Sequence, residues 1–154
     1  MPILSVQLQA QIQGGALLVK EGPKVPIQLQ VPSALEQHLQ NESSPVPAPV
    51  RGMALIDTGA TMSMVDGGAI TNLGVSPVGS VTLGTASGST QCPVYPVRLA
   101  IVMPDQTLFF SGEFSSITSG PLQQMGLLAL LGRDVLQHSQ FVYDGPSNRF
   151  SVAF

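Results

Sequence analysis

Apolar residues alternate with glutamines in two stretches near the start of the chain, and this period of two limits the local structure to β-strand. In residues 6–12 the apolar side chains stand at the even positions, and in residues 25–31 they stand at the odd ones. A strand with one face buried and one face in water has this pattern. Two turns are predicted between these stretches, at Gly14-Gly15 and at residues 21–23, with residues 16–19 as a short strand between them.

The rest of the chain also reads mainly as strands separated by Gly-rich and Pro-rich turns. Further strands are expected at residues 51–56, 61–65, 81–83, 94–102, 107–114 and 127–131, followed by a hairpin of residues 141–143 and 150–154. Ser33 and Glu36 fit a capping box, which predicts one short helix over residues 33–40. Residues 41–49 are rich in Ser and Pro and are expected to form an exposed loop, residues 67–74 a turn-rich or helical connection, and residues 134–138 a helical turn.

The composition excludes several classes of function. Only 10% of the 154 residues are charged, against about 25% in ordinary globular domains, which favours a chain that buries part of its surface against a partner. The net charge is −3 and no basic cluster is present, so neither the composition nor the charge supports a nucleic-acid partner. No apolar stretch is long enough to cross a bilayer and no secretory signal is evident, so we expect a cytoplasmic protein without a membrane partner.

Few side chains can carry chemistry. The single cysteine, Cys92, excludes an internal disulfide and a cysteine zinc site, and it is expected to be inert. His38 and His138 lack metal-ligand spacing, and no phosphate-binding loop, serine elbow or dinucleotide fingerprint occurs. The aspartates are Asp57, Asp66, Asp105, Asp134 and Asp144.

Asp57 differs from the other aspartates in its context. It follows the apolar run Met-Ala-Leu-Ile at residues 53–56 and precedes Thr58, Gly59 and Ala60. Gly59 permits a tight turn and a close backbone approach. An isolated Asp-Thr-Gly is more often a simple turn cap, so the motif alone is a weak indication of catalysis.

Two further elements strengthen the catalytic interpretation, because their order and spacing match a known pattern. One is the Gly-rich hairpin of residues 81–90, and the other is the segment Leu130-Leu131-Gly132-Arg133-Asp134. With Asp57-Thr58-Gly59-Ala60 they resemble the retropepsin-like aspartic proteases over residues 25–154. The resemblance implies an all-β, closed barrel with a flap hairpin and one or two short helices. Residues 1–154 would form a single domain, with amino-terminal strands in 1–24, an insertion in 33–49 and the catalytic core in 50–154.

The resemblance also implies roles for individual residues. Asp57 matches the catalytic aspartate, and the active-site loop continues through Thr58, Gly59 and Ala60. The strand that supports this loop from behind matches Leu130, Leu131 and Gly132. The flap tip that closes over a bound peptide matches Gly84, Thr85, Ala86, Ser87 and Gly88. Arg133 matches a position that often makes structural ion pairs.

Aspartic protease chemistry requires two adjacent carboxylates that share one proton, one activating a water and the other polarising the scissile carbonyl. This chain has one Asp-Thr-Gly, so a twofold homodimer is expected to bring Asp57 opposite its copy. The reaction needs no metal and no organic cofactor, since water is the nucleophile. Because one Asp must stay protonated, activity is expected in a mildly acidic window. The apolar face of Phe150, Val152 and Phe154 is equally consistent with a dimer seam and with plain core.

Two other functions are considered, a nucleotide-binding one that the chain length argues against and a catalytically silent one that the sequence leaves open. Asp57-Thr58-Gly59-Ala60-Thr61 fits the Asp-x-Gly-x-Thr phosphate loop of sugar kinases, but that fold needs two large lobes and the chain is too short. A catalytically silent module with the protease fold, serving dimerisation or peptide binding, would carry the same residues. Outside the motif, Asp66 is expected at a turn or on the surface, Asp134 as a helix cap, and His138 packed or in solvent.

Overall fold

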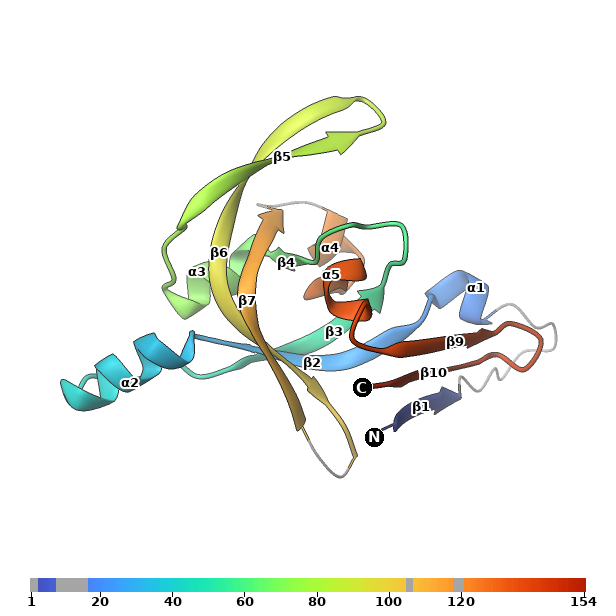
Figure 1. Cartoon of the computed structure of the whole chain (residues 1–154), viewed down its shortest axis with the longest axis horizontal. Helices are drawn as coiled ribbons and strands as arrows, with labels where there is room; N and C mark the ends of the chain where they lie inside the picture. Colours follow the sequence, from blue (N-terminus) through green and yellow to red (C-terminus); the bar gives the residue numbers. More distant parts are fainter. Residues whose placement is uncertain (1–2, 8–16, 105–106, 118–120) are drawn as a thin grey trace.

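The computed structural model describes residues 3–7, 17–104, 107–117 and 121–154, and this part of the chain is mostly β (Figure 1). Its strands are β1 (Ile3–Gln7), β2 (Lys24–Gln30), β3 (Val50–Ile56), β4 (Met64–Asp66), β5 (Gly79–Thr85), β6 (Gly88–Val102), β7 (Thr107–Ile117), β8 (Ala129–Leu131), β9 (Gln140–Asp144) and β10 (Arg149–Ala153). Its helices are α1 (Leu17–Glu21), α2 (Ser33–Asn41), α3 (Gly67–Leu73), α4 (Pro121–Gln124) and α5 (Arg133–Leu136).

The larger sheet has the strand order β2-β3-β8-β4-β7-β6-β5, and β2 also pairs with β6. Six of these strands form a ring, because the pairings return from β6 to β2, and β6 pairs in addition with β5. The mostly β fold expected from the sequence is therefore confirmed, while a fully closed barrel stays a prediction. Strand β5 lies outside the ring and forms a long hairpin with the first half of β6, which projects beyond the rest of the molecule (Figure 1).

The alternation predicted for residues 25–31 is confirmed in β2. Val25, Ile27 and Leu29 are fully buried, while Gln28 and Gln30 are half-buried. Removing one such side chain from water stabilises the fold by about 1.5–3 kcal/mol, so the apolar positions determine which face of β2 lies inward. Val97, Leu99 and Ile101 of β6 pack into the same core.

Strand β8 lies between the two strands that flank the Asp-Thr-Gly segment. It pairs parallel with β3 and antiparallel with β4. The chain from β3 to β4, residues 57–63, therefore passes across the end of β8. Because β3 and β8 run in the same direction, their carboxyl ends meet at one edge of the sheet, and residues 57 and 132 come together there.

The chain termini form a separate three-stranded sheet in the order β1-β10-β9. The predicted terminal hairpin is confirmed as β9 and β10. Phe150 and Val152 are 1% exposed and belong to the core of this chain, and the Phe150 ring lies 6.3 Å from that of Phe141. Phe150 and Val152 are therefore core residues and are not exposed for contact with a second copy. The strand predicted over residues 6–12 overlaps β1 at residues 6–7, and its remainder lies outside the described residues.

Several local predictions were wrong. Residues 17–19, expected as a strand, begin helix α1, because a short apolar run fits a strand and a buried helix equally well. The described residues contain five short helices, more than the one or two expected. Helix α2 is confirmed, but its N-cap is Pro32 and no side chain caps it, so Ser33 does not form a capping box. Residues 61–63 bend, and only Met64–Asp66 pairs as β4.

The β9–β10 turn carries a pH-dependent contact. The pKa of the Asp144 carboxyl is below its ordinary value of 3.8, because the Ser147 hydroxyl and N–H donate to it and Arg149 lies nearby. A lowered pKa means that this contact stabilises the fold above pH 3.8 and that its contribution is lost as the pH falls through the folded-state value. A carboxyl NMR titration is expected to give Asp144 a midpoint below 3.8, and a midpoint above 3.8 would contradict this assignment.

Candidate functional site

Asp57 lies immediately beyond the last residue of β3, at the edge where β3 and β8 end. Its backbone N–H donates to the Leu131 carbonyl at 2.9 Å, which continues the parallel pairing by one residue. The Asp57 side chain is half-buried, whereas Thr58 and Gly59 are exposed. The carboxylate thus lies at the edge of the sheet and is partly exposed to solvent.

The turn after Asp57 holds the carboxylate against the backbone. Asp57 Oδ1 accepts a hydrogen bond from the Gly59 N–H at 2.9 Å, and the Ala60 N–H donates to the Asp57 carbonyl at 3.2 Å. A Cβ at Gly59 would lie 3.1 Å from Asp57 Oδ1, tighter than most real contacts. A glycine at position 59 therefore allows this close approach, as the sequence predicts.

The Arg133 side chain holds the same turn by hydrogen bonds. Its guanidinium donates to the Thr58 carbonyl at 2.7 Å, to the Gly59 carbonyl at 3.1 Å and to Thr61 Oγ1 at 2.9 Å. A structural role was expected for Arg133, and the sequence did not identify its partner. In the described part of the chain its partners are carbonyl and hydroxyl oxygens of the Asp57 turn, and nothing in the local sequence indicates such partners 72–75 positions away.

Gly132 and Ser63 lock the turn to the end of β8. The Gly132 N–H donates to Ser63 Oγ at 2.9 Å, and the Ser63 hydroxyl donates to Asp134 Oδ1 at 2.7 Å. The Ser63 N–H lies 2.9 Å from both Asp134 oxygens, and Ser63 is fully buried. A Cβ at Gly132 would lie 2.7 Å from the Met62 carbonyl carbon, so the two segments are in backbone contact.

Asp134 therefore has a different main partner from the one expected. The N-cap of α5 is Gly132, and Asp134 anchors Ser63 instead, besides accepting from the Val135 N–H at 2.9 Å. Sequence reasoning missed Ser63. The only available signal was a small polar residue between Met62 and Met64, which is too common to be diagnostic.

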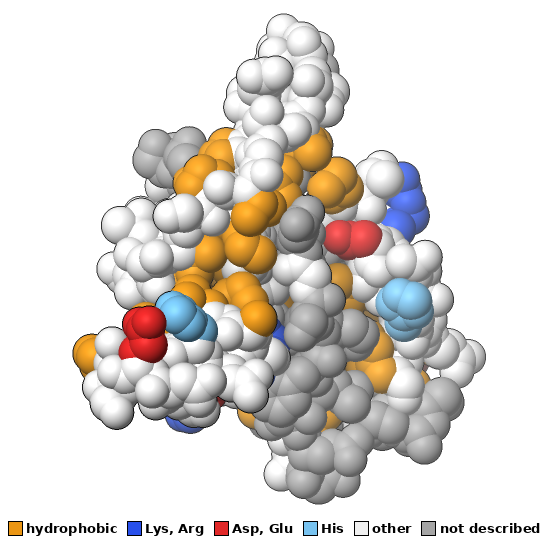
Figure 2. Space-filling model, turned by 60° about the vertical axis from the view of Figure 1, so that its left-hand side comes forward, with side chains coloured by type: hydrophobic (Ala, Val, Ile, Leu, Met, Phe, Trp, Pro, Cys, Tyr) orange, Lys and Arg blue, Asp and Glu red, His pale blue; other side chains and the backbone are white. Residues whose placement is uncertain are grey.

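A cavity of about 600 Å³ separates this turn from the β5–β6 hairpin. Its lining residues are Gly59, Ala60, Thr61, Met62, Met64, Thr82, Leu83, Gly84, Thr90 and Cys92. Asp57 is not among them, but the next residues of its turn are. None of the described residues that line the cavity is charged, and in Figure 2 hydrophobic side chains gather below the projecting hairpin at the top. The cavity suits an uncharged or apolar chain segment.

The hairpin turn includes the residues predicted as a flap tip. Gly84 faces the cavity, Ala86 and Ser87 are exposed at the turn, and Gly88 has a φ of +137° that favours glycine. Thr85 pairs with Gly88 at the end of the ladder.

One chain places one carboxylate in this turn. Asp66 caps α3, Asp134 binds Ser63 and Asp144 lies in the β9–β10 turn, so these three aspartates are engaged elsewhere. Within the described ranges no group of three or more His, Cys, Asp or Glu side chains is placed to hold a metal ion. Cys92 is half-buried in the cavity wall, and His138 is exposed.

No helix in the described part of the chain combines the length and the apolar character needed to cross a membrane.

The chain was compared with protein families, curated proteins and solved structures. No family model and no curated protein matches it. Among solved structures it is similar to the EIAV protease in complex with the inhibitor HBY-793, with 16% identity, a TM-score of 0.45, and coverage of 85% of this chain and 93% of that one. It is also similar to the simian foamy virus (mac) protease, with 15% identity, a TM-score of 0.40, and coverage of 73% and 91%. A retropepsin-like aspartic protease from Rickettsia conorii shows 14% identity and a TM-score of 0.40, with coverage of 84% and 90%.

Proposed function

We propose that this chain is an aspartic endopeptidase that acts as a homodimer, with Asp57 of each copy forming the catalytic pair. The observation that carries the proposal is the Asp57 turn itself. A half-buried carboxylate sits at the rigid end of β3, is held by Gly59 and Arg133, and adjoins an uncharged cavity under a projecting hairpin. A simple turn cap needs neither the guanidinium clamp nor the adjoining cavity.

The proposed reaction uses one ionised and one protonated Asp57. The ionised carboxylate takes a proton from water as the water oxygen adds to the scissile carbonyl carbon, and the protonated partner gives its proton to the carbonyl oxygen. The C–N bond of the resulting diol then breaks. The Asp57 that took the proton from water gives it to the amine nitrogen, and one hydroxyl of the diol gives its proton to the other Asp57, which leaves a carboxylic acid, a free amine and a singly protonated pair. Because the reaction needs one ionised and one protonated carboxyl group, the rate should fall on both sides of a mildly acidic window.

The second copy is proposed because the described residues supply no other carboxylate to the Asp57 turn. Exposed apolar side chains on the terminal sheet offer a contact surface, since Ile3, Val142 and Tyr143 are 61%, 48% and 46% exposed. Large apolar side chains left in water often mark such surfaces.

The substrate is proposed to be an extended polypeptide lying between the Asp57 turn and the β5–β6 hairpin. An extended chain can form main-chain hydrogen bonds with neighbouring strand edges and place alternate side chains in pockets. Met62, Met64 and Leu83 would contact apolar side chains of the substrate. We propose that residues 84–88 act as the flap over it.

Cleavage of a disordered polypeptide, followed by mass spectrometry between pH 3 and pH 9 over a range of enzyme concentrations, tests this function. We expect internal cleavage that is fastest at mildly acidic pH, with a rate per chain that falls on dilution as dimers dissociate. Saturable binding of the polypeptide without any cleavage would instead identify a silent peptide-binding module. An undiminished rate at concentrations where only monomers exist would contradict the shared site.

A further inference from the structure

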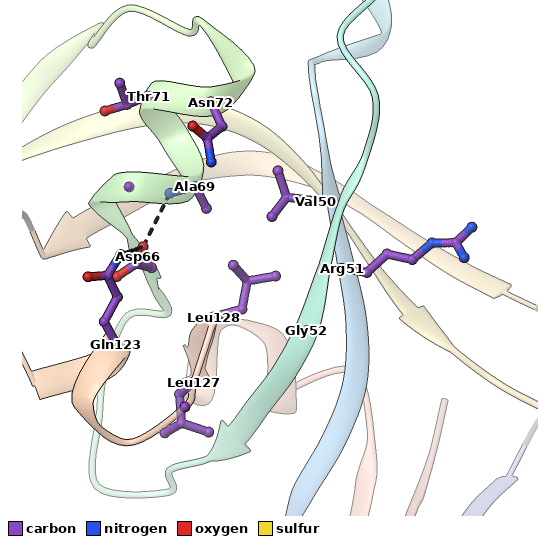
Figure 3. A pocket seen from close by; sticks show the side chains of 12 residues that line it. Val50, Arg51, Gly52, Asp66, Ala69, Thr71, Asn72, Gln123, Leu127 and Leu128 are labelled. Atoms are coloured by element: carbon purple, nitrogen blue, oxygen red, sulfur yellow. Dashed lines mark hydrogen bonds between the residues drawn. The ribbon is translucent and has the colours of Figure 1, made fainter.

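A second cavity of about 600 Å³ lies between α3, β3 and the α4–β8 segment (Figure 3). None of its lining residues is shared with the cavity beside the Asp57 turn. The proposed peptidase reaction uses none of them. One buried carboxylate, Asp66, lies in its wall.

Asp66 was expected at a turn or on the surface, but it is only 4% exposed. Its Oδ2 accepts from the Ala69 N–H at 3.2 Å, which caps α3, and lies 3.4 Å from the Gln123 amide nitrogen. Its Oδ1 is buried and finds no hydrogen-bond partner among the described residues. A carboxylate oxygen buried without a donor is costly, so an unpaired one in a cavity wall indicates a missing partner.

The other residues of the cavity wall indicate the chemistry of a ligand that would pair with Asp66. Val50, Ala69, Leu127 and Leu128 supply apolar surface opposite and beside the carboxylate. Among the lining residues that the structure describes, Asp66 is the only acidic one, and Figure 3 shows the Arg51 side chain pointing away from the cavity. A ligand that fits has a cationic hydrogen-bond donor at one end and a short apolar chain behind it.

Gln123 controls access to Asp66. Its side chain lies beside the carboxylate in Figure 3, is exposed at the surface, and is held to Asp66 only by the long 3.4 Å contact. A Cβ at Gly68 would lie 2.8 Å from the Gln123 amide nitrogen and 3.0 Å from Asp66 Oδ2, so a side chain at this position would push the amide away from its present place beside the carboxylate. An entering donor would displace this amide and pair with the carboxylate.

We propose that this cavity binds an alkylammonium or alkylguanidinium group, with Asp66 as the charged acceptor. Charge-assisted hydrogen bonds to a carboxylate are the strongest that such groups make, and the apolar wall shields them from water. Both a lysine or arginine side chain and a free amine carry this chemistry. The proposal does not depend on the peptidase function, and its test measures binding only.

The test is a titration of the 15N-labelled chain with n-butylammonium and with n-butylguanidinium, followed by NMR at the amides of residues 66–73. We expect saturable shifts at these amides for at least one of the two cations, and none for n-butanol, which lacks the charge. A blocked lysine amide and a free diamine then distinguish a side chain from a small amine as the natural source. Absence of saturable shifts with both cations would overturn the proposal, and water would then be the remaining hydrogen-bond partner for Asp66 Oδ1.

Two variants and a control make the result specific. Asp66→Asn retains an oxygen for the Ala69 N–H and should weaken cation binding about tenfold or more. Asp144→Asn removes the same charge far from the cavity and should leave binding unchanged. Gln123→Lys should place an ammonium beside Asp66 in the same chain, raising the melting temperature and abolishing butylammonium binding. Equal affinity in Asp66→Asn and the parent chain, or a lower melting temperature with unchanged binding in Gln123→Lys, would contradict the proposal.

Discussion

Replacing Asp57 by asparagine is expected to lower the rate of peptide hydrolysis by about 10³-fold or more, because an amide neither takes a proton from water nor gives one to the carbonyl oxygen. The fold should survive, since the asparagine Oδ1 can still accept the Gly59 N–H hydrogen bond seen at 2.9 Å. The measurement is the steady-state cleavage rate at mildly acidic pH, with circular dichroism and the dimer mass recorded in parallel.

Asp144→Asn is the matched control for this experiment, because it makes the same chemical change in the β9–β10 turn. Its cleavage rate should equal that of the parent chain. Retention of cleavage by a folded, dimeric Asp57→Asn protein would remove Asp57 from the mechanism.

Replacing Gly132 by alanine is expected to destabilise the chain and to reduce activity together. The added Cβ would lie 2.7 Å from the Met62 carbonyl carbon, 2.8 Å from its oxygen and 3.0 Å from the Ala60 oxygen. These are backbone atoms of the Asp57–Ser63 segment, so the segment must shift. The φ of Gly132 is −86°, which alanine adopts freely, so the expected destabilisation comes from the steric clash of the added Cβ and not from backbone strain. Overpacking of this kind costs about 1–3 kcal/mol.

Urea unfolding measures the stability loss, and Gly79→Ala provides the comparison. A Cβ at Gly79 meets nothing within 4 Å, so that variant should stay within about 0.5 kcal/mol of the parent. Activity in Gly132→Ala should fall because the Ser63–Gly132 hydrogen bond and the Arg133–Ala60 backbone contact position the turn. Equal unfolding free energies for the two alanine variants would show that the close approach does not constrain the loop.

The sequence predicted the parts of the fold that depend on local pattern. The alternation of Val25, Ile27 and Leu29 identified a half-buried strand, and the Gly-rich stretch of residues 81–90 identified the hairpin. The position of Asp57 at the end of an apolar strand followed from the same kind of evidence. Each of these features is encoded within about ten consecutive residues.

The parts that the sequence did not predict depend on partners far along the chain. Arg133 holds Thr58, and Ser63 binds Asp134 across 71 positions, so neither contact leaves a local pattern. The burial of Asp66 was missed as well, and one of its side-chain partners, Gln123, is 57 positions away. Helix α1 was mistaken for a strand because five residues are too few to separate the two periods.

The central claim is that each active site needs an Asp57 from two copies, and a mixing experiment tests it most directly. A fixed amount of parent chain is incubated with increasing amounts of Asp57→Asn chain, above the dimer dissociation constant and until subunits have exchanged. Native mass spectrometry of isotopically labelled chains verifies the exchange. Mixed dimers hold one carboxylate, so total activity should fall in proportion to the parent fraction, to about a half at equal amounts and about a tenth at ninefold excess of the variant. Activity that stays constant after complete exchange would show that a single chain carries a whole active site, and it would contradict the shared pair.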